Sequence, residues 1–160
     1  MGPISLMERP GSSAFDIEFV TLPDGTGQQR DLAVVADFTG GVEIFDITDL
    51  LYGSSAGRTP IATWTVPPSV LEGIPPNVYD VEIDLPTPGA AVANIYVASS
   101  RGGVYVLDIN LTLPNIITQN PQRIKTPGEA HSIEIRSSSA GKLMLVGDLS
   151  AGYRFYRIGN

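Results

Sequence analysis

Residues 32–47 have the sequence LAVVADFTGGVEIFDI, and the expected architecture of the chain follows from them. They consist of an apolar run, a short connection that contains Gly40 and Gly41, and a second apolar run interrupted by acidic residues. Two runs of this kind on either side of a glycine-containing turn are typical of a β-hairpin. A positive φ at Gly41 would close the turn at little steric cost. The stretch therefore predicts two antiparallel strands.

The same pattern occurs two more times along the chain. Residues 94–109 (NIYVASSRGGVYVLDI) align with the first stretch without a gap, and residues 143–158 (LMLVGDLSAGYRFYRI) form a looser third copy. Gly41, Gly103 and Gly152 fall in the same slot of the three copies. Three such matches identify an internal repeat.

Further short elements surround each predicted hairpin. Residues 14–19, 78–83 and 130–135 precede the three hairpins and have strand-like composition. Residues 61–66 follow the first hairpin as a predicted fourth strand, and residues 122–125 follow the second as a shorter, charged edge strand. The repeating unit is then four antiparallel strands in about 50–60 residues, which is the size of one β-propeller blade.

The third unit contains only three predicted strands, and we expect the N-terminal segment to supply the fourth. Residues 4–11 stand before the first unit much as residues 123–128 stand before the third. The predicted fold is therefore all-β, a single propeller half-domain over residues 1–160 with three four-stranded blades. The expected blades are residues 14–77, residues 78–129, and residues 130–160 together with 1–11.

Propellers usually have four to eight blades, so three blades are not expected to close a ring alone. Closing a ring removes the unpaired strand edges that an open array would expose. We therefore expect a homodimer that forms a six-bladed ring, in which each N-terminal strand completes the third blade of the other copy. The alternative is that the chain forms part of a larger propeller protein.

Several short pieces resemble the LVIVD-repeat family of propellers. They are AHSI at 130–133, GGV at 40–42, FDITD at 45–49 and TPGEA at 126–130. The resemblance implies a surface, periplasmic or secreted propeller, and thus an extracellular or periplasmic location. A more distant likeness is to selenium-binding protein and methanethiol oxidase propellers, which use copper and several histidines. This chain has one histidine and no cysteine, so that copper chemistry is not carried over.

Composition narrows the range of partners. The chain has 10 Lys and Arg against 17 Asp and Glu, a formal net charge of −7, and no basic run. Nucleic acid and anionic membrane surfaces are therefore not expected partners, because both attract positive patches. No stretch approaches the ~18 consecutive apolar residues of a membrane span. Residues 1–6 lack the basic and apolar regions of a signal peptide.

The candidate functional residues are repeated carboxylates. Glu18, Glu82 and Glu134 recur at equivalent positions, and Asp16 and Asp80 stand two residues before the first two. On innermost strands these side chains would line a central channel, where hard oxygen ligands suit a cation such as Ca²⁺. The alternative, favoured because the residues recur in every repeat, is that each Glu accepts hydrogen bonds from the neighbouring blade. No other cofactor is predicted.

For two further motifs we prefer a structural interpretation to a catalytic one. His131 is the only histidine and occupies the slot of Phe15 and Tyr79, which favours packing at a channel mouth over catalysis. Residues 53–57 (GSSAG) match G-x-S-x-G with Ser55 as the nucleophile, but lack the strand before it and the helix after it. A flexible loop is the better interpretation.

Polar residues at the ends of the predicted strands are expected to fix turns. Asp and Ser side chains in such positions bond nearby backbone amides. This set comprises Asp24, Asp37, Asp46, Ser99, Asp108 and Asp148. Asn110-Leu111-Thr112 matches the N-glycosylation pattern, which has meaning only in a secreting eukaryote.

Taken together, these features predict a non-catalytic β-propeller module that acts in binding or assembly. Its expected contact surfaces are the channel mouths and the Pro-rich loops 52–60, 67–77 and 110–121. No catalytic residue is predicted. The alternative function is an enzyme, or an enzyme subunit, with an acidic axial site built from Glu18, Glu82 and Glu134 and completed by His131.

Overall fold

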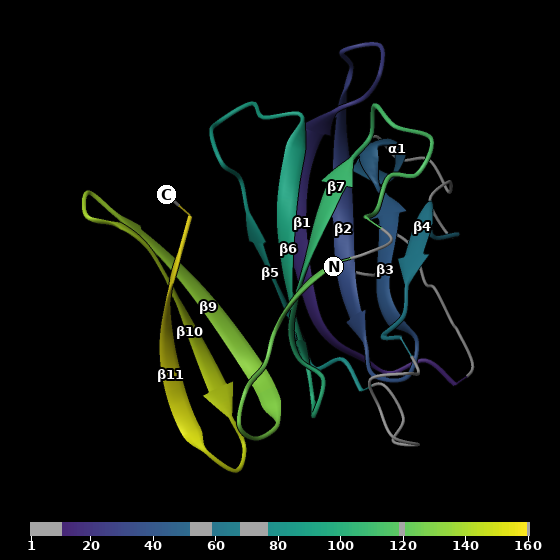
Figure 1. Ribbon diagram of the computed structural model, residues 1–160. Coiled ribbons are helices and arrows are strands. Elements are labelled where there is room, and N and C mark those ends of the chain that lie inside the picture. The colour runs from purple at the N-terminus through teal and green to yellow at the C-terminus, as the bar shows by residue number, and fades with distance from the viewer. Residues whose placement is uncertain (1–10, 52–58, 68–76, 119–120, 160) are drawn as a thin grey trace, which may run out of the picture.

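The fold is all-β, as the sequence predicts. The computed structural model describes residues 11–51, 59–67, 77–118 and 121–159 (Figure 1). These residues form eleven strands and one short helix, α1 (Thr48–Leu51). All strand pairs within the sheets are antiparallel, as expected for hairpin connections.

The strands form three separate sheets that follow the order of the chain. The first sheet has the order β1-β2-β3-β4, with β1 Ala14–Pro23, β2 Gln29–Asp37, β3 Gly41–Asp46 and β4 Ala62–Trp64. The second has the order β5-β6-β7-β8, with β5 Asp80–Asp84, β6 Val92–Ser99, β7 Gly103–Asn110 and β8 Gln122–Ile124. The third has the order β11-β10-β9, with β9 Ala130–Ser138, β10 Gly141–Asp148 and β11 Gly152–Ile158.

The three sheets lie within the ranges expected for the three repeats, but the third differs from the expected four strands. Its described residues form three strands. The segment expected to supply the fourth, residues 1–11, lies almost wholly outside the described part of the chain.

Glycine closes the second turn of each sheet, as predicted. Gly41, Gly103 and Gly152 have φ of 91°, 82° and 83°, a region that side chains with a Cβ rarely adopt. At Gly103 a Cβ would lie 2.5 Å from the carbonyl oxygen of Ile124 in the outer strand β8. At Gly152 a Cβ would meet nothing within 4 Å, because no described fourth strand lies beside β11.

The sheets stand side by side, with their first strands adjacent. β5 lies between β1 and β9, so the first strand of each sheet is its innermost one. Figure 1 shows the three sheets in a row, with the third splayed away from the second at its upper end. The side of each sheet that points to the next sheet along the chain is called its forward face here, and the opposite side its rear face.

Strand periodicity divides the side chains between these faces. On β6, Tyr96 and Ala98 point forward into a core shared with the third sheet, and Ile95 and Val97 point back into a core shared with the first. The first core contains most of the large buried side chains, among them Leu22, Leu32, Ile44, Val81, Ile95, Leu107 and Ile109. The second core is smaller and contains Tyr96, Ala98, Val104, Ala130, Ile133, Met144, Val146 and Ile158.

The sheets do not close into a ring. No other sheet of the described residues covers the rear face of the first sheet or the forward face of the third, although among the strands of the first sheet only β1 carries exposed apolar side chains on the rear face, since Ala33, Glu43 and Phe45 are buried. The described residues contain no helix that is long and apolar enough to cross a membrane.

Candidate functional site

The inner strands bring the repeated glutamates into one row. Glu18 pairs with Val34, Glu82 with Tyr96 and Glu134 with Leu145, at equivalent positions of the three sheets. Since β1, β5 and β9 are neighbours, the three carboxylates influence one another electrostatically. The sequence repeat therefore becomes a spatial array.

Aspartates in this row connect one sheet to the next. The Asp16 carboxylate accepts a hydrogen bond from the backbone amide of Val81 at 3.2 Å. The Asp80 carboxylate accepts one from the amide of Ile133 at 2.6 Å. Each side chain thus satisfies an outward-facing amide of the following inner strand, which removes a buried unpaired donor. Ser132 occupies the corresponding position of the third sheet.

Crowding and burial raise the proton affinity of the central carboxyls. Burial, reinforced by the neighbouring Asp16, raises the pKa of Asp80 to about 7. Burial and repulsion from Glu18 and Glu134 raise the pKa of Glu82 to about 7. Burial and the charge of Asp16 also raise the pKa of Glu18. Two of the carboxyls therefore exchange protons near neutral pH.

Calcium binding at the row stays a prediction. The described residues contain no cluster of three or more His, Cys, Asp or Glu arranged to hold a metal ion. At the exposed end of the row, Glu134 instead forms an ion pair with Arg136 at 3.0 Å.

His131 packs against aromatic rings at one end of the inner strands. Its ring stacks on Tyr79 with the centroids 4.2 Å apart. Tyr79 in turn contacts Phe15 and Phe38, whose rings stack on each other at 5.1 Å. The residues that share one slot in the repeat thus form an aromatic row across the three sheets.

The predicted turn-fixing role holds for two of the three residues at the hairpin starts. Asp37 accepts hydrogen bonds from Ser12 and from the amide of Gly40. Asp148 accepts bonds from the amides of Gly128, Ser150 and Ala151, at 2.9–3.2 Å. The prediction is wrong for Ser99, whose buried hydroxyl has no hydrogen-bond partner among the described residues.

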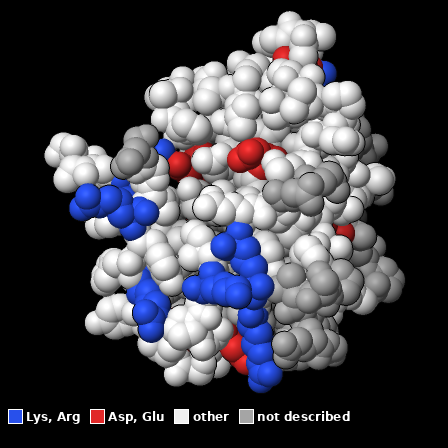
Figure 2. Space-filling model, viewed as in Figure 1, with Lys and Arg blue, Asp and Glu red and all other residues white. Residues whose placement is uncertain are grey.

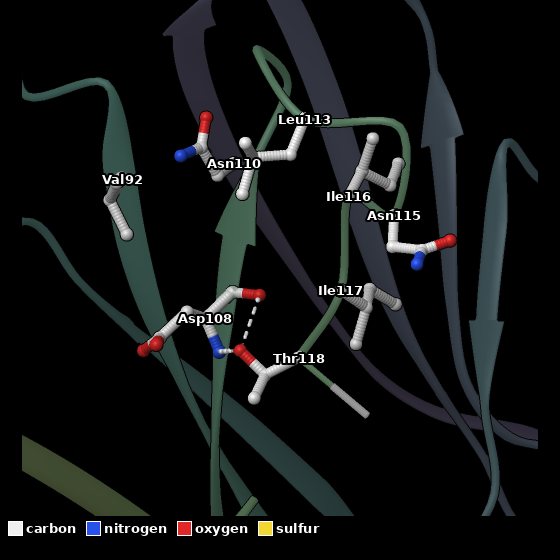
Figure 3. A pocket seen from close by; sticks show the side chains of 8 residues that line it. All are labelled: Val92, Asp108, Asn110, Leu113, Asn115, Ile116, Ile117 and Thr118. Atoms are coloured by element: carbon white, nitrogen blue, oxygen red, sulfur yellow. Dashed lines mark hydrogen bonds between the residues drawn. The ribbon is translucent and has the colours of Figure 1, made fainter. Parts of the chain in front are cut away.

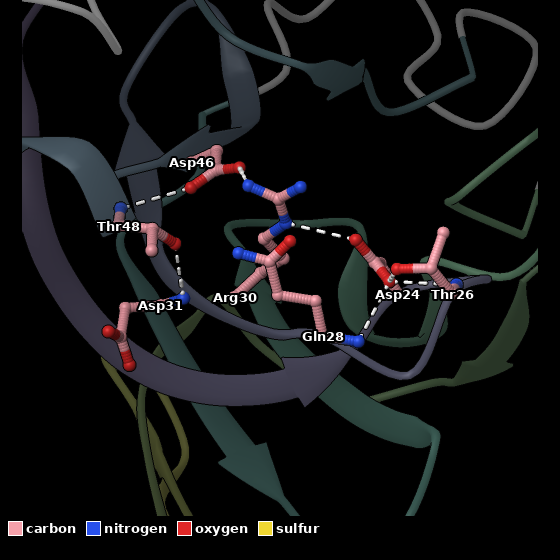
Figure 4. A network of polar contacts seen from close by, with 7 residues as sticks. All are labelled: Asp24, Thr26, Gln28, Arg30, Asp31, Asp46 and Thr48. Atoms are coloured by element: carbon pink, nitrogen blue, oxygen red, sulfur yellow. Dashed lines mark hydrogen bonds and ion pairs between the residues drawn. The ribbon is translucent and has the colours of Figure 1, made fainter.

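Asp24 organises the first loop, as expected for a turn (Figure 4). Its carboxylate accepts bonds from the amides of Thr26 and Gln28, at 2.8 and 3.0 Å, and from the Arg30 guanidinium at 3.0 Å. These bonds, those from Thr26 above all, lower its pKa. Arg30 also lies 3.8 Å from Asp46, so the cation connects two acidic turn residues rather than facing a ligand.

Cavities in the described part of the chain lie away from the glutamate row. One of about 320 Å³ lies beneath the loop after β7, between Val92, Asp108 and Ile117 (Figure 3). In this loop the Asn110 side chain accepts bonds from Thr112, which explains the N-x-T pattern as a local turn. The larger cavity, about 820 Å³, lies between the second and third sheets beside the Asp84–Lys142 ion pair.

Charge is distributed unevenly over the sheets. Figure 2 shows basic side chains over the β9–β11 sheet and the lower centre of the view, and acidic side chains in the hollow above them. The third sheet carries four basic residues, Arg136, Lys142, Arg154 and Arg157, against Glu134 and Asp148. The acidic net charge of the chain therefore does not extend to its C-terminal sheet.

Ser55 and most of the Pro-rich loops 52–60 and 67–77 lie outside the described residues, whereas loop 110–121 is described except for residues 119–120. Comparison of the chain with protein-family models, with curated proteins and with solved structures found no match.

The structure reveals one feature that the motif search missed, namely two exposed apolar strips at the ends of the row. On β1, Phe15, Ile17 and Phe19 are 54%, 48% and 66% exposed, whereas Ala33 and Phe45 farther out on the same sheet are buried. The other strip is Leu143, Tyr153 and Phe155 on the third sheet, which are 45%, 72% and 65% exposed. Comparing the exposure of equivalent positions in the three sheets identifies both strips, since their equivalents in the second sheet are covered.

Proposed function

We propose that this chain is a non-catalytic β-propeller module that acts by binding and assembly, with each sheet serving as one blade. The observation that carries the proposal is the pair of exposed apolar strips at the two ends of the open row. Monomeric proteins rarely leave apolar strips of this kind without an interaction partner. The resemblance of the repeats to LVIVD propellers supports the same function.

Positions equivalent to the strips in the other sheets are covered by a neighbouring sheet, which is why we expect the strips to bind a partner. Ile17 of the first sheet is 48% exposed, whereas its equivalents Val81 and Ile133 are 0% and 6% exposed because the preceding sheet covers them. Tyr153 of the third sheet is 72% exposed, whereas its equivalent Val104 is 0% exposed. The two strips therefore have the character of interfaces between blades.

The partner that we propose is a second copy, which completes a six-bladed ring, or the remainder of a larger propeller. Sedimentation of the purified chain at several concentrations tests this. We expect a particle of about twice the chain mass of 17.0 kDa. A single 17.0 kDa species with a folded β spectrum would exclude the dimer and leave only a larger propeller as partner.

An enzyme or enzyme subunit with an acidic axial site is the second candidate. It is favoured by Asp80 and Glu82, whose pKa values near 7 suit proton transfer at neutral pH. Replacing Glu18, Glu82 and Glu134 together with Gln separates the two functions. Loss of stability alone supports the assembly module, whereas bound metal in the unaltered protein, lost in the triple variant, supports the axial site.

A further inference from the structure

We propose that a second copy of this chain docks the rear face of its first sheet onto the forward face of the third sheet, so that Arg136 of one copy faces Asp31 of the other. This inference rests on the proposed assembly function and specifies its contact. Along the inner strands, where Ile17 and Phe19 are exposed, the contact repeats between two copies the step by which each sheet packs on the next within one chain. It is a head-to-tail contact, since different surfaces of the two copies meet.

One pair of positions recurs at every junction between sheets and carries matched chemistry. At the first junction the forward position is Val20 and the rear position is Ala93, and both belong to the first core. At the second junction the same two positions are Asp84 and Lys142, which form an ion pair at 2.6 Å. Each junction thus pairs complementary groups, either apolar with apolar or anion with cation.

Strand register identifies the same positions at the free ends. Val20, Asp84 and Arg136 pair with Leu32, Asn94 and Leu143, respectively. The residues that precede these three partners are the rear positions, which are Asp31, Ala93 and Lys142. The forward position at the end of the row is therefore Arg136, and the rear position at its beginning is Asp31.

Arg136 and Asp31 carry opposite charges in the reverse order to Asp84 and Lys142. In the single chain both are held by neighbours on their own sheet. Arg136 pairs with Glu134, at 81% exposure of its side chain, and Asp31 accepts a bond from Thr21 at 2.6 Å. The reversed pair favours this junction over a junction that would place Arg136 against Lys142.

The backbone contact of the inner strands continues in the same way. Asp16 and Asp80 receive the amides of Val81 and Ile133 at the two internal junctions. At the free ends, Ser132 occupies the acceptor position and Ile17 the amide position. A hydroxyl accepts an amide bond as a carboxylate does, but it adds no further negative charge beside Asp80.

The apolar surfaces and the overall charge also fit. Beside Phe19, Leu32 and Ile47 the first sheet has a hollow of about 370 Å³, next to the strip on β1. The third sheet offers exposed Leu143, Tyr153 and Phe155 to such a surface. Taken as a whole, the third sheet is basic and the first sheet is acidic, since residues 14–51 carry Arg30 against eight acidic residues, although Asp16 and Lys142 are engaged at the internal junctions. Opposite charge on the two sheets favours their encounter.

The test uses charge reversal in the full chain, followed by sedimentation and by light scattering. Arg136→Asp and Asp31→Arg should each weaken self-association about tenfold or more, because like charges then meet at the junction. Equal amounts of the two variants should associate with each other, since one junction then joins the two introduced charges, which are opposite, and the other junction keeps the original pair. Arg101→Asp is the matched control, because Arg101 is 63% exposed and pairs with Glu129 at 3.0 Å away from both end faces.

Phe155→Ser is a second variant, and its effect does not depend on charge. Because the Phe155 side chain is 65% exposed, we expect this substitution to leave the fold intact. It should weaken self-association as Arg136→Asp does, with an unchanged circular dichroism spectrum. A dimeric parent chain that both substitutions leave dimeric would overturn this contact while leaving the assembly function in place. A parent chain that stays at 17.0 kDa would overturn the contact and the homodimer together. Two charge-reversal variants that fail to associate when mixed would also overturn it.

Discussion

Gly103 and Gly152 occupy the same slot of the repeat but differ in their surroundings. Both have positive φ, so Ala at either position is strained by about 1–2 kcal/mol. Only at Gly103 would a Cβ also press on the Ile124 carbonyl of an outer strand. Overpacking of this kind adds about 1–3 kcal/mol, so Gly103→Ala should destabilise the chain more than Gly152→Ala.

Denaturant unfolding of the two variants beside the parent chain measures this difference. Gly41→Ala is a useful third case, because a Cβ there would press on the Trp64 carbonyl of β4 and should behave like the one at Gly103. Equal destabilisation at Gly103 and Gly152 would contradict the reasoning.

The adjacent inner strands make stability depend on pH. Asp80 and Glu82 have pKa values of about 7 in the folded chain, above the 3.8 and 4.5 of the unfolded groups, so the folded state binds the extra protons. Their contribution to stability is present below pH ~4 and is lost as the pH rises to 7 and beyond. We therefore expect the free energy of unfolding to fall between pH 5 and pH 8.

Asp80→Asn should make this dependence shallower. Asn keeps a side-chain oxygen that accepts the Ile133 amide, and it removes a carboxyl that faces Asp16 and Glu82. Unfolding at pH 5 and pH 8, at one protein concentration and one salt concentration, provides the measurement. Asp37 is a suitable contrast, since its pKa is lowered and its contribution disappears only in more acidic solution. A variant as pH-dependent as the parent chain would assign the effect to other groups.

At the element scale the repeat predicts the hairpins, the turn glycines and the short fourth strands, because all three depend on local chemistry. The lengths of the inner strands are less predictable. β1 continues to Pro23 and β9 to Ser138, beyond the apolar runs that suggest them. Their polar ends, such as Thr21 and Arg136, join the ladder because Asp31 and Leu143 lie opposite in register. Backbone pairing thus continues where hydrophobic patterning stops.

The candidate site is predictable only in part from the sequence. The recurrence of Glu18, Glu82 and Glu134 is visible along the chain, but their pKa shifts depend on burial and on three strands lying side by side. The contact from Asp16 to the Val81 amide joins residues 65 positions apart. Local sequence patterns do not reveal contacts between residues so far apart in the chain. The same reasoning applies to Phe15 and Phe155. Both are apolar like the core residues, but they are exposed because they lie on the first and the last sheet of the row.

At the scale of the whole molecule, the N-terminal segment gives a prediction about assembly. The described third sheet has three strands, and none of the described residues lies beside Gly152 where the other two sheets have an outer strand. We expect a chain without residues 1–10 to associate more weakly, because the strand predicted to complete the third blade is removed. Sedimentation of the shortened and parent chains at equal concentration tests this. Unchanged association would refute strand exchange and leave the Arg136 contact unaffected.

The head-to-tail character of the row has a consequence for how far growth proceeds. When copies join through unlike surfaces, each added copy leaves one surface of each kind free at the ends of the particle. The particle is complete only when the rotation from sheet to sheet brings these two ends together. In the second core, Met144 and Val146 of the third sheet pack against side chains of the second, such as Tyr96 and Ala98. If copies associate by the contact proposed above, altering the volume of these side chains would change the rotation per sheet and favour open fibres over a closed particle.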